Sequence, residues 1–329
     1  MKRHFCTLFD KNYLYKGLSL YNSLVRHCPD FTLWILCMDE QTYEVLDKLH
    51  LEKARLIWRA DFEDSELIKV KPTRTIAEYC WTCTPSLPLY VLQLEPTLDM
   101  VAYLDADLFF YSDPAPIYEE FGDRSIMIIE HRFPDHLKHL EVNGIYNVQM
   151  LIFRNNKQGR ECLSWWRERC LEWCYYRLEN GKLGDQKYLD DWTTRFQGVH
   201  VLQHVGAGVA LWNAMRYTVS QKNGITYIDD QKLIFYHFHA FTLVEGGGYK
   251  IGNNDNYPLT PLKIELLYDP YVAGIYQARD QVKSIDKSFN FGFTSSLSTI
   301  KPSIPARLLA ALRNLPSRLR SRLTGSGGH

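Results

Sequence analysis

The stretch that decides the fold runs from Met100 to Phe110 and reads MVAYLDADLFF. Its first residues, up to Leu104, are apolar, which is typical of a strand buried on both faces of a parallel sheet. Two carboxylates, Asp105 and Asp107, follow with one small residue between them. Because side chains alternate along an extended chain, both carboxylates point the same way if the extended geometry continues.

The Asp105–Asp107 pair has two interpretations. Asp-x-Asp triplets are common, and most are solvated loop ends. Here, however, apolar residues flank the pair on both sides, and buried carboxylates are costly unless they are paired or bound to a cation. Two oxygen donors on one side suit Mn²⁺ or Mg²⁺, which keep coordination places for water and phosphate oxygens. We therefore expect a divalent metal site at the end of this strand.

The residues around this strand alternate between strand and helix patterns. Strand patterns cover residues 4–9, 31–38, 54–58, 125–129 and 143–154, and helical patterns cover residues 14–27, 41–49, 72–94 with breaks at Pro85 and Pro88, 158–178 and 184–189. The alternation predicts right-handed βαβ units and a mixed, mostly parallel α/β sheet with helices on both faces. Ligands of such sheets bind beyond the carboxyl ends of the strands.

The composition is that of a globular protein, with 46% hydrophobic and 23% charged residues among 329. Lys and Arg together number 38, as do Asp and Glu, so no excess of positive charge indicates a nucleic-acid partner. Cys80 and Cys83 have CxxC spacing without a second ligand pair, which favours buried free thiols over a zinc knuckle. With no signal-peptide pattern and no long uncharged apolar run, we expect a cytoplasmic protein.

Residues 300–323 differ from the rest of the chain. They contain no acidic residue, and their leucines recur at helical spacing among basic residues. A basic amphipathic helix can bind an anionic membrane surface, although a helix docked on the protein or a partly disordered tail would show the same pattern. We expect peripheral contact with the inner face of the cell membrane. Residues 325–329 look like a remnant of cloning.

Six stretches carry a more specific signal. They are Phe9 to Tyr13 with Gly17 and Ser23-Leu24, Tyr103 to Asp107 with Asp113-Pro114, Tyr146 to Asn155, Gly184 to Gln186, Leu211 to Asn213, and His237 to His239. In this order they resemble the GT-A glycosyltransferases, in particular the retaining family 8 group, which includes glycogenin and bacterial lipopolysaccharide galactosyl- and glucosyltransferases. The second stretch is similar to that family's YLDxD metal motif, and the last is similar to its HFxG segment.

The resemblance implies a fold, a reaction and partners. It implies a GT-A catalytic domain over residues 1–275, followed by a C-terminal extension over residues 276–324 with a helical tail. It implies transfer of a hexose, with retention, from a nucleotide sugar, expected to be UDP-linked, and with Mn²⁺ or Mg²⁺ bound. The acceptor would be a hydroxyl of a cell-surface glycan or of a lipid-linked precursor.

The resemblance also implies roles for individual residues. Asp105, Asp107 and His237 would bind the metal, with His239 as the alternative histidine, since alternation would put both on one face of a strand. Asp185 and Gln186 would be the catalytic residues beside the donor sugar, although Asp185 is also suited to be a helix N-cap.

A wider set of residues would bind the donor. This set is Phe9, Asp10, Tyr13, Arg74, Asp105, Ala106, Asn147 and Lys250. Packing is the alternative for Tyr13, and a surface position is the alternative for Arg74. The chain departs from the family pattern at Gln149, where the family often has glycine, and after His237, where Lys250 follows a Gly-rich loop in place of Lys-Pro-Trp.

Two other classes of function remain open. A metal-dependent nucleotidyltransferase on a similar sheet would favour a Gly-rich loop with Lys or Arg after the first strand, and Phe9 to Asn12 contain no glycine. A binding protein could retain the nucleotide-sugar pocket without turnover. The presence of Asp105, Asp107 and Asp185 argues against such a loss.

Overall fold

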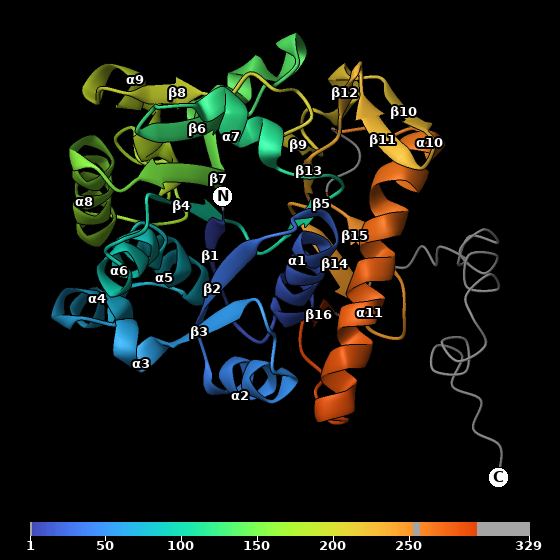
Figure 1. The fold of residues 1–329 in the computed structure, drawn as a ribbon, viewed down its shortest axis with the longest axis horizontal. Coiled ribbons are helices and arrows are strands. Elements are labelled where there is room, and N and C mark those ends of the chain that lie inside the picture. The colour runs from blue at the N-terminus through green and yellow to red at the C-terminus, as the bar shows by residue number, and fades with distance from the viewer. Residues whose placement is uncertain (1, 253–256, 295–329) are drawn as a thin grey trace.

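A computed structural model describes residues 2–252 and 257–294 of the chain (Figure 1). Within these residues the central sheet has seven strands. Their order is β3 (Ala54–Trp58), β2 (Phe31–Cys37), β1 (Arg3–Phe9), β4 (Met100–Leu104), β7 (Tyr146–Arg154), β6 (Ile126–Glu130) and β8 (Val199–Val201). Strand β7 runs antiparallel to β4 and β6, and the other neighbours in this sheet are parallel.

Helices cover both faces of the sheet (Figure 1). One face packs against α1 (Leu14–His27), α2 (Glu40–Leu49), α7 (Ala115–Phe121) and α11 (Asp269–Ile285). The other packs against α3 (Arg59–Phe62), α4 (Ser65–Val70), α5 (Ile76–Cys83), α6 (Ser86–Leu94), α8 (Lys157–Glu172) and α9 (Trp192–Arg195). Side-chain alternation explains the two layers: Phe5 of β1 faces the first set and Cys6 faces the second, and both are fully buried.

Three small sheets flank the central one. They are β5 (Leu108–Phe110), β13 (Phe235–His237) and β9 (Val209–Ala210); β10 (Val219–Lys222), β11 (Ile225–Ile228) and β12 (Gln231–Lys232); and β15 (Tyr249–Ile251), β14 (Phe241–Val244) and β16 (Phe293–Thr294). Short helical segments connect these elements: η1 (Lys71–Thr73), η2 (Asp135–Asn143), η3 (Gln186–Asp191), η4 (Ala214–Arg216), α10 (Pro261–Lys263) and η5 (Ile264–Tyr268). Strand β13 pairs antiparallel with β5, which follows the Asp105–Asp107 pair directly.

The predicted fold is confirmed: the molecule has the GT-A arrangement, a mixed and mostly parallel sheet with helices on both faces. The predicted helix over residues 14–27 matches α1 at both ends. In α1, Gly17 lies so close to the Phe9 ring that a Cβ on Gly17 would be 2.2 Å from a ring carbon. Helix α11 packs along α1 and spans the expected domain boundary at 275/276 (Figure 1).

One helix is shorter than predicted. Helix α8 ends at Glu172 instead of continuing to residue 178, and Trp173 takes an extended backbone conformation. A long-range contact holds the chain beyond it, because the Tyr176 N–H donates to the buried Glu78 carboxylate at 2.7 Å. This bond crosses from α5 to the segment after α8, so the local sequence pattern gave no sign of it.

The remaining expectations concern cysteines and membranes. All eight cysteines are free, including Cys80 and Cys83 of α5. In the part of the chain that the structure describes, no helix is long and apolar enough to span a bilayer. The predicted amphipathic helix over 300–323 and residues 325–329 lie outside the described residues.

Candidate active site

The Asp105–Asp107 pair lies at the carboxyl end of β4, in a turn. The Leu108 N–H donates to the Asp105 carbonyl at 3.2 Å, so the extended geometry stops at Leu104. The turn leads into β5, whose Leu108 pairs with His237 of β13. As a result, one ligand atom from each of Asp105, Asp107 and His237 lies within 4.8 Å of the others. His237 Nε2 is 3.1 Å from an Asp107 oxygen and 3.7 Å from an Asp105 oxygen.

The charges of this group depend on one another. Burial together with the Asp107 charge raises the pKa of Asp105 to about 6, against the opposing charge of His237. Burial also opposes ionisation of Asp107, but the neighbouring His237 charge outweighs it and holds the pKa of Asp107 well below its usual value. Burial disfavours a charged His237, yet the two carboxylates raise its pKa. The group therefore has two carboxylates that both interact with one positively charged imidazole, that of His237.

A buried lysine lies behind the group. Lys16 of α1 is 8% exposed, and its ammonium lies 4.0 Å from the centre of the Tyr13 ring. Burial lowers the pKa of Lys16, and the Asp107 charge partly offsets this effect. We did not predict a role for Lys16 from the sequence, although a lysine among the inward-facing positions of an amphipathic helix was a usable signal.

Asp185 and Gln186 face the metal group across the same cleft, at the start of η3. Gly184, at φ +54°, allows the turn that presents them, and a Cβ at this position would lie 3.4 Å from the Trp81 ring. Asp185 occupies the N-cap position of η3, but its side chain makes no capping hydrogen bond. Burial and then the Asp105 charge raise the pKa of Asp185 to about 8. At neutral pH this carboxyl is protonated and can both donate and accept hydrogen bonds.

Asn147, at the start of β7, hydrogen-bonds the catalytic candidate beside it. Its Nδ2 donates to Gln186 Oε1 at 2.7 Å, and its Oδ1 accepts from the Gln149 N–H at 3.1 Å. Asn147 Nδ2 also lies 3.1 Å from Nε2 of His131, which follows the carboxyl end of β6. The rule that ligands bind at the carboxyl ends of strands, applied to β6, could have indicated His131.

Apolar side chains form one wall of the cleft. Ile76 and Trp81 of α5 lie there with Tyr176, and the Trp81 and Tyr176 rings are 5.6 Å apart. Tyr176 is 78% exposed and Ile76 70% exposed, which is unusual for large apolar side chains. The sequence pattern does not indicate this wall, because Tyr176 lies within the helix predicted over residues 158–178.

The cleft, with a volume of about 540 Å³, collects most of the residues predicted for the site. Those that line it are Phe9, Asp10, Tyr13, Asp105, Ala106, Asp107, Asn147, Asp185, Gln186, His237 and His239. His239 is exposed and lies outside the group of three metal-ligating candidates. The Asp10 carboxylate accepts bonds from the Asn12 backbone and side chain, so it shapes the loop between β1 and α1.

Two predicted donor-binding residues do not line the cleft. Arg74 donates to the Leu171 carbonyl at 3.3 Å and lies 3.9 Å from the centre of the Tyr175 ring. Lys250 lies in β15, which pairs with β14. In this structure, therefore, Arg74 and Lys250 lie outside the lining of the cleft.

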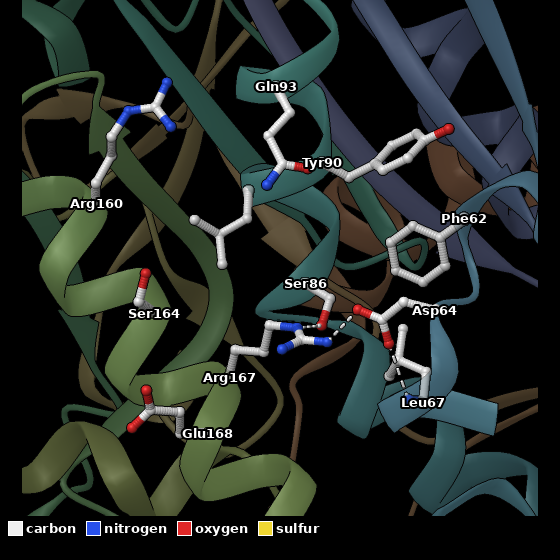
Figure 2. Close-up of a pocket in the computed structure, with 11 residues that line it drawn as sticks. Phe62, Asp64, Leu67, Ser86, Tyr90, Gln93, Arg160, Ser164, Arg167 and Glu168 are labelled. Carbon is white, nitrogen blue, oxygen red and sulfur yellow. Dashed lines mark hydrogen bonds and ion pairs between the residues drawn. The ribbon is translucent and has the colours of Figure 1, made fainter. Parts of the chain in front are cut away.

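A second pocket, of about 420 Å³, lies between α6 and α8 (Figure 2). Arg167 reaches across it and bonds Ser86, Asp64 and Glu66. Arg160 at its edge bonds Asn155 and the Leu92 carbonyl. Both arginines of this pocket are already hydrogen-bonded, so the pocket offers little of the chemistry found in the cleft.

Comparison with known proteins gives two curated relatives from Bacillus subtilis (strain 168), while no family model matches the chain. The uncharacterized protein YfnD is 35% identical over 299 residues, which cover 88% of this chain and 94% of YfnD. The uncharacterized protein YfnF is 35% identical over 305 residues, which cover 90% of this chain and 98% of YfnF.

Solved glycosyltransferase structures are similar at lower identity. The galactosyltransferase LgtC, in complex with donor and acceptor sugar analogues, is 14% identical with a TM-score of 0.49, and the match covers 85% of this chain and 95% of LgtC.

Proposed function

The chain belongs to the same family as YfnD and YfnF of Bacillus subtilis, and we propose that it is a metal-dependent glycosyltransferase. It would move a hexose from a nucleotide sugar, expected to be UDP-linked, to an acceptor hydroxyl with retention. One observation carries the proposal: a group of three metal-ligating side chains faces Asp185 and Gln186 across one cleft, at the sheet edge where ligands of α/β proteins bind.

The donor set fits Mn²⁺ or Mg²⁺. Two carboxylates and one imidazole, from Asp105, Asp107 and His237, leave about three octahedral positions for water and phosphate oxygens. Burial, together with the Asp107 charge, raises the pKa of Asp105, and a divalent cation bound between the two carboxylates would oppose both effects. When bound, the cation would neutralise the diphosphate as it leaves.

Asp185, Gln186 and Asn147 would bind the transferred sugar. The bond between the anomeric carbon and the phosphate oxygen breaks, and its electron pair leaves with the diphosphate. The acceptor oxygen forms the new bond to the anomeric carbon, and its proton passes to an oxygen of the departing diphosphate. Asp185 would hydrogen-bond hydroxyls of the sugar, since its carboxyl can donate and accept. The Gln186 carbonyl dipole would stabilise the positive charge that develops at the anomeric carbon.

The nucleoside would lie at the carboxyl end of β1. Phe9, Asp10 and Tyr13 line the cleft there, and the Tyr13 ring is 41% exposed and available for stacking. The Lys16 ammonium lies against the Tyr13 ring, and its positive charge acts on Asp107. We assign no donor contact to Arg74 or Lys250, because neither lines the cleft.

The acceptor would enter along the apolar wall of Ile76, Trp81 and Tyr176. The C–H faces of sugar rings stack on aromatic rings, and this wall ends beside Gly184 and Asp185. A cell-surface glycan or its lipid-linked precursor would suit such a wall. For a lipid-linked acceptor, residues 300–323 would hold the enzyme at an anionic membrane, which deletion of this segment and vesicle co-sedimentation would test.

Binding and slow hydrolysis of a panel of nucleotide sugars test the proposal. Each donor is assayed with Mn²⁺ and with chelator, on the wild type, on Asp107→Ala and on a matched control, Asp64→Ala, which removes a carboxylate at the second pocket. We expect metal-dependent hydrolysis of one donor that only Asp107→Ala abolishes. Binding without hydrolysis, also in the presence of acceptor extracts, would favour a binding protein. Release of a sugar phosphate with transfer of the nucleotide would favour a nucleotidyltransferase.

A further inference from the structure

His131 is held in a fixed position behind the catalytic side of the cleft. It is 6% exposed, and its ring stacks on Phe133 with the ring centres 4.8 Å apart. The Ile145 carbonyl lies 2.9 Å from the His131 backbone N–H and 3.3 Å from Nδ1. On its other side the ring contacts Trp212, whose indole N–H donates to the His131 carbonyl.

These contacts determine which ring nitrogen carries the proton. The Ile145 carbonyl can only accept, so Nδ1 must donate to it, and Nε2 of the neutral ring is then an acceptor. Burial lowers the pKa of His131 to about 3, in keeping with a neutral ring. The Asn147 amide must therefore present its NH₂ group to His131 Nε2 at 3.1 Å.

The orientation passes from His131 through Asn147 to Gln186. The two hydrogens of Asn147 Nδ2 go to His131 Nε2 and to Gln186 Oε1, and the Gln149 N–H occupies Asn147 Oδ1. Gln186 Nε2 in turn donates to the Asn143 carbonyl at 3.2 Å. Turning over either amide would place donor against donor or acceptor against acceptor, so the whole chain has one arrangement.

We propose that His131 is a positioning residue that, through Asn147, fixes which end of the Gln186 amide faces the donor sugar. The proposal rests on the function proposed above for Gln186. Gln186 lines the cleft, and with Oε1 bonded once by Asn147, one lone pair of this oxygen stays available. An amide whose carbonyl end is held in place before the sugar binds stabilises positive charge without reorganising.

The test compares variants in donor hydrolysis. His131→Phe keeps a stacked ring but removes the acceptor, and we expect kcat to fall about 10- to 100-fold, with the dissociation constant of the donor changed less than about threefold. His131→Gln places an amide oxygen near the position of Nε2 and should recover part of kcat. The control is His200→Phe on β8. This variant loses a hydrogen bond to Glu120, and neither residue lines the cleft, so kcat should not change.

Gln186→Ala separates failure of this proposal from failure of the proposed function. If Gln186→Ala loses kcat whereas His131→Phe keeps it, the positioning role is overturned. If Gln186→Ala keeps the wild-type kcat, the proposed role of Gln186 fails, and the catalytic purpose of His131 fails with it.

Nitrogen NMR of the imidazoles tests the arrangement without turnover. We expect one histidine with Nδ1 protonated and Nε2 unprotonated at neutral pH, whose signals disappear in His131→Phe and shift in Asn147→Ala. A His131 protonated at Nε2 would overturn the proposal.

Discussion

The cleft and the second pocket differ in chemistry far more than in size, at about 540 and 420 Å³. In the second pocket Arg167 bonds two carboxylates and a hydroxyl, so its charges are already paired (Figure 2). In the cleft, Asp105 and Asp107 share one histidine, and Asp185 is a third carboxyl beside them. Incompletely paired charge, and not volume, therefore distinguishes the cleft from the second pocket.

The largest expected effect separates the two histidines of the cleft. His237 belongs to the group of three ligands and His239 does not. We expect His237→Ala to reduce metal-dependent donor hydrolysis by about 10²- to 10³-fold, because a cation ligand is lost. His239→Ala is the matched control and should stay within about tenfold of the wild type. A larger loss in His239→Ala would reassign the third ligand.

The second prediction concerns the pH dependence of the free energy of unfolding, through Asp185. The folded state keeps the Asp185 proton up to about pH 8, whereas the unfolded chain releases it near pH 4. Between these values the unfolded chain binds fewer protons, so the free energy of unfolding falls as the pH rises. Asp185→Asn removes this effect while it impairs turnover.

Urea unfolding in chelator checks this prediction. The stability gained in Asp185→Asn over the wild type should grow by about 1 kcal/mol or more from pH 5 to pH 8. If the gain in the free energy of unfolding is the same at both pH values, folding does not raise the pKa of Asp185 and the prediction is wrong. Asp64→Asn at the second pocket serves as the control.

An acceptor assay probes the apolar wall. Tyr176→Ala and Trp81→Ala should each raise the KM for the acceptor by about fivefold, because a stacked ring contributes about 1 kcal/mol. The donor dissociation constant should not change. Since Tyr176 is exposed and Trp81 is partly buried, Tyr176→Ala is the cleaner variant. An unchanged acceptor KM in both variants would exclude the wall as the acceptor site.

The smallest expected effect is at the second pocket. Arg167→Ala removes ion pairs whose carboxylates are more than half exposed. We expect the free energy of unfolding to fall by less than about 1 kcal/mol, with donor hydrolysis unchanged. A marked loss of donor hydrolysis would show that the second pocket is part of the functional site, contrary to the distinction drawn above.

Local patterns predicted the strands β1, β2, β3, β4, β6 and β7 and the helices α1, α2, α5 and α6, because each is a continuous apolar run or a helix-spaced one. They did not indicate the shorter helices α3, α4 and α7. They also placed Asp105, Asp107 and Asp185 near strand and helix ends. The approach of His237 to the pair depends on β13 pairing with β5, which joins residues far apart in the chain. Only the resemblance indicated this contact, since spacing alone carries no information about it.

Other features could not be read from the sequence. The wall at Tyr176 exists because Glu78 of α5 binds its backbone and ends the helical run early. The position of His131 depends on Ile145, Asn147 and Trp212, which come from separate elements. Arg74 matched a family pattern, but its packing on Tyr175 is set by the tertiary structure.

Locating Mn²⁺ by its anomalous scattering, in crystals soaked with Mn²⁺ and UDP, tests the proposed metal site directly. We expect one strong peak within ligand distance of Asp105, Asp107 and His237, with diphosphate oxygens completing the coordination. A peak elsewhere, or UDP bound in the cleft with no Mn²⁺ beside these three residues, would contradict it.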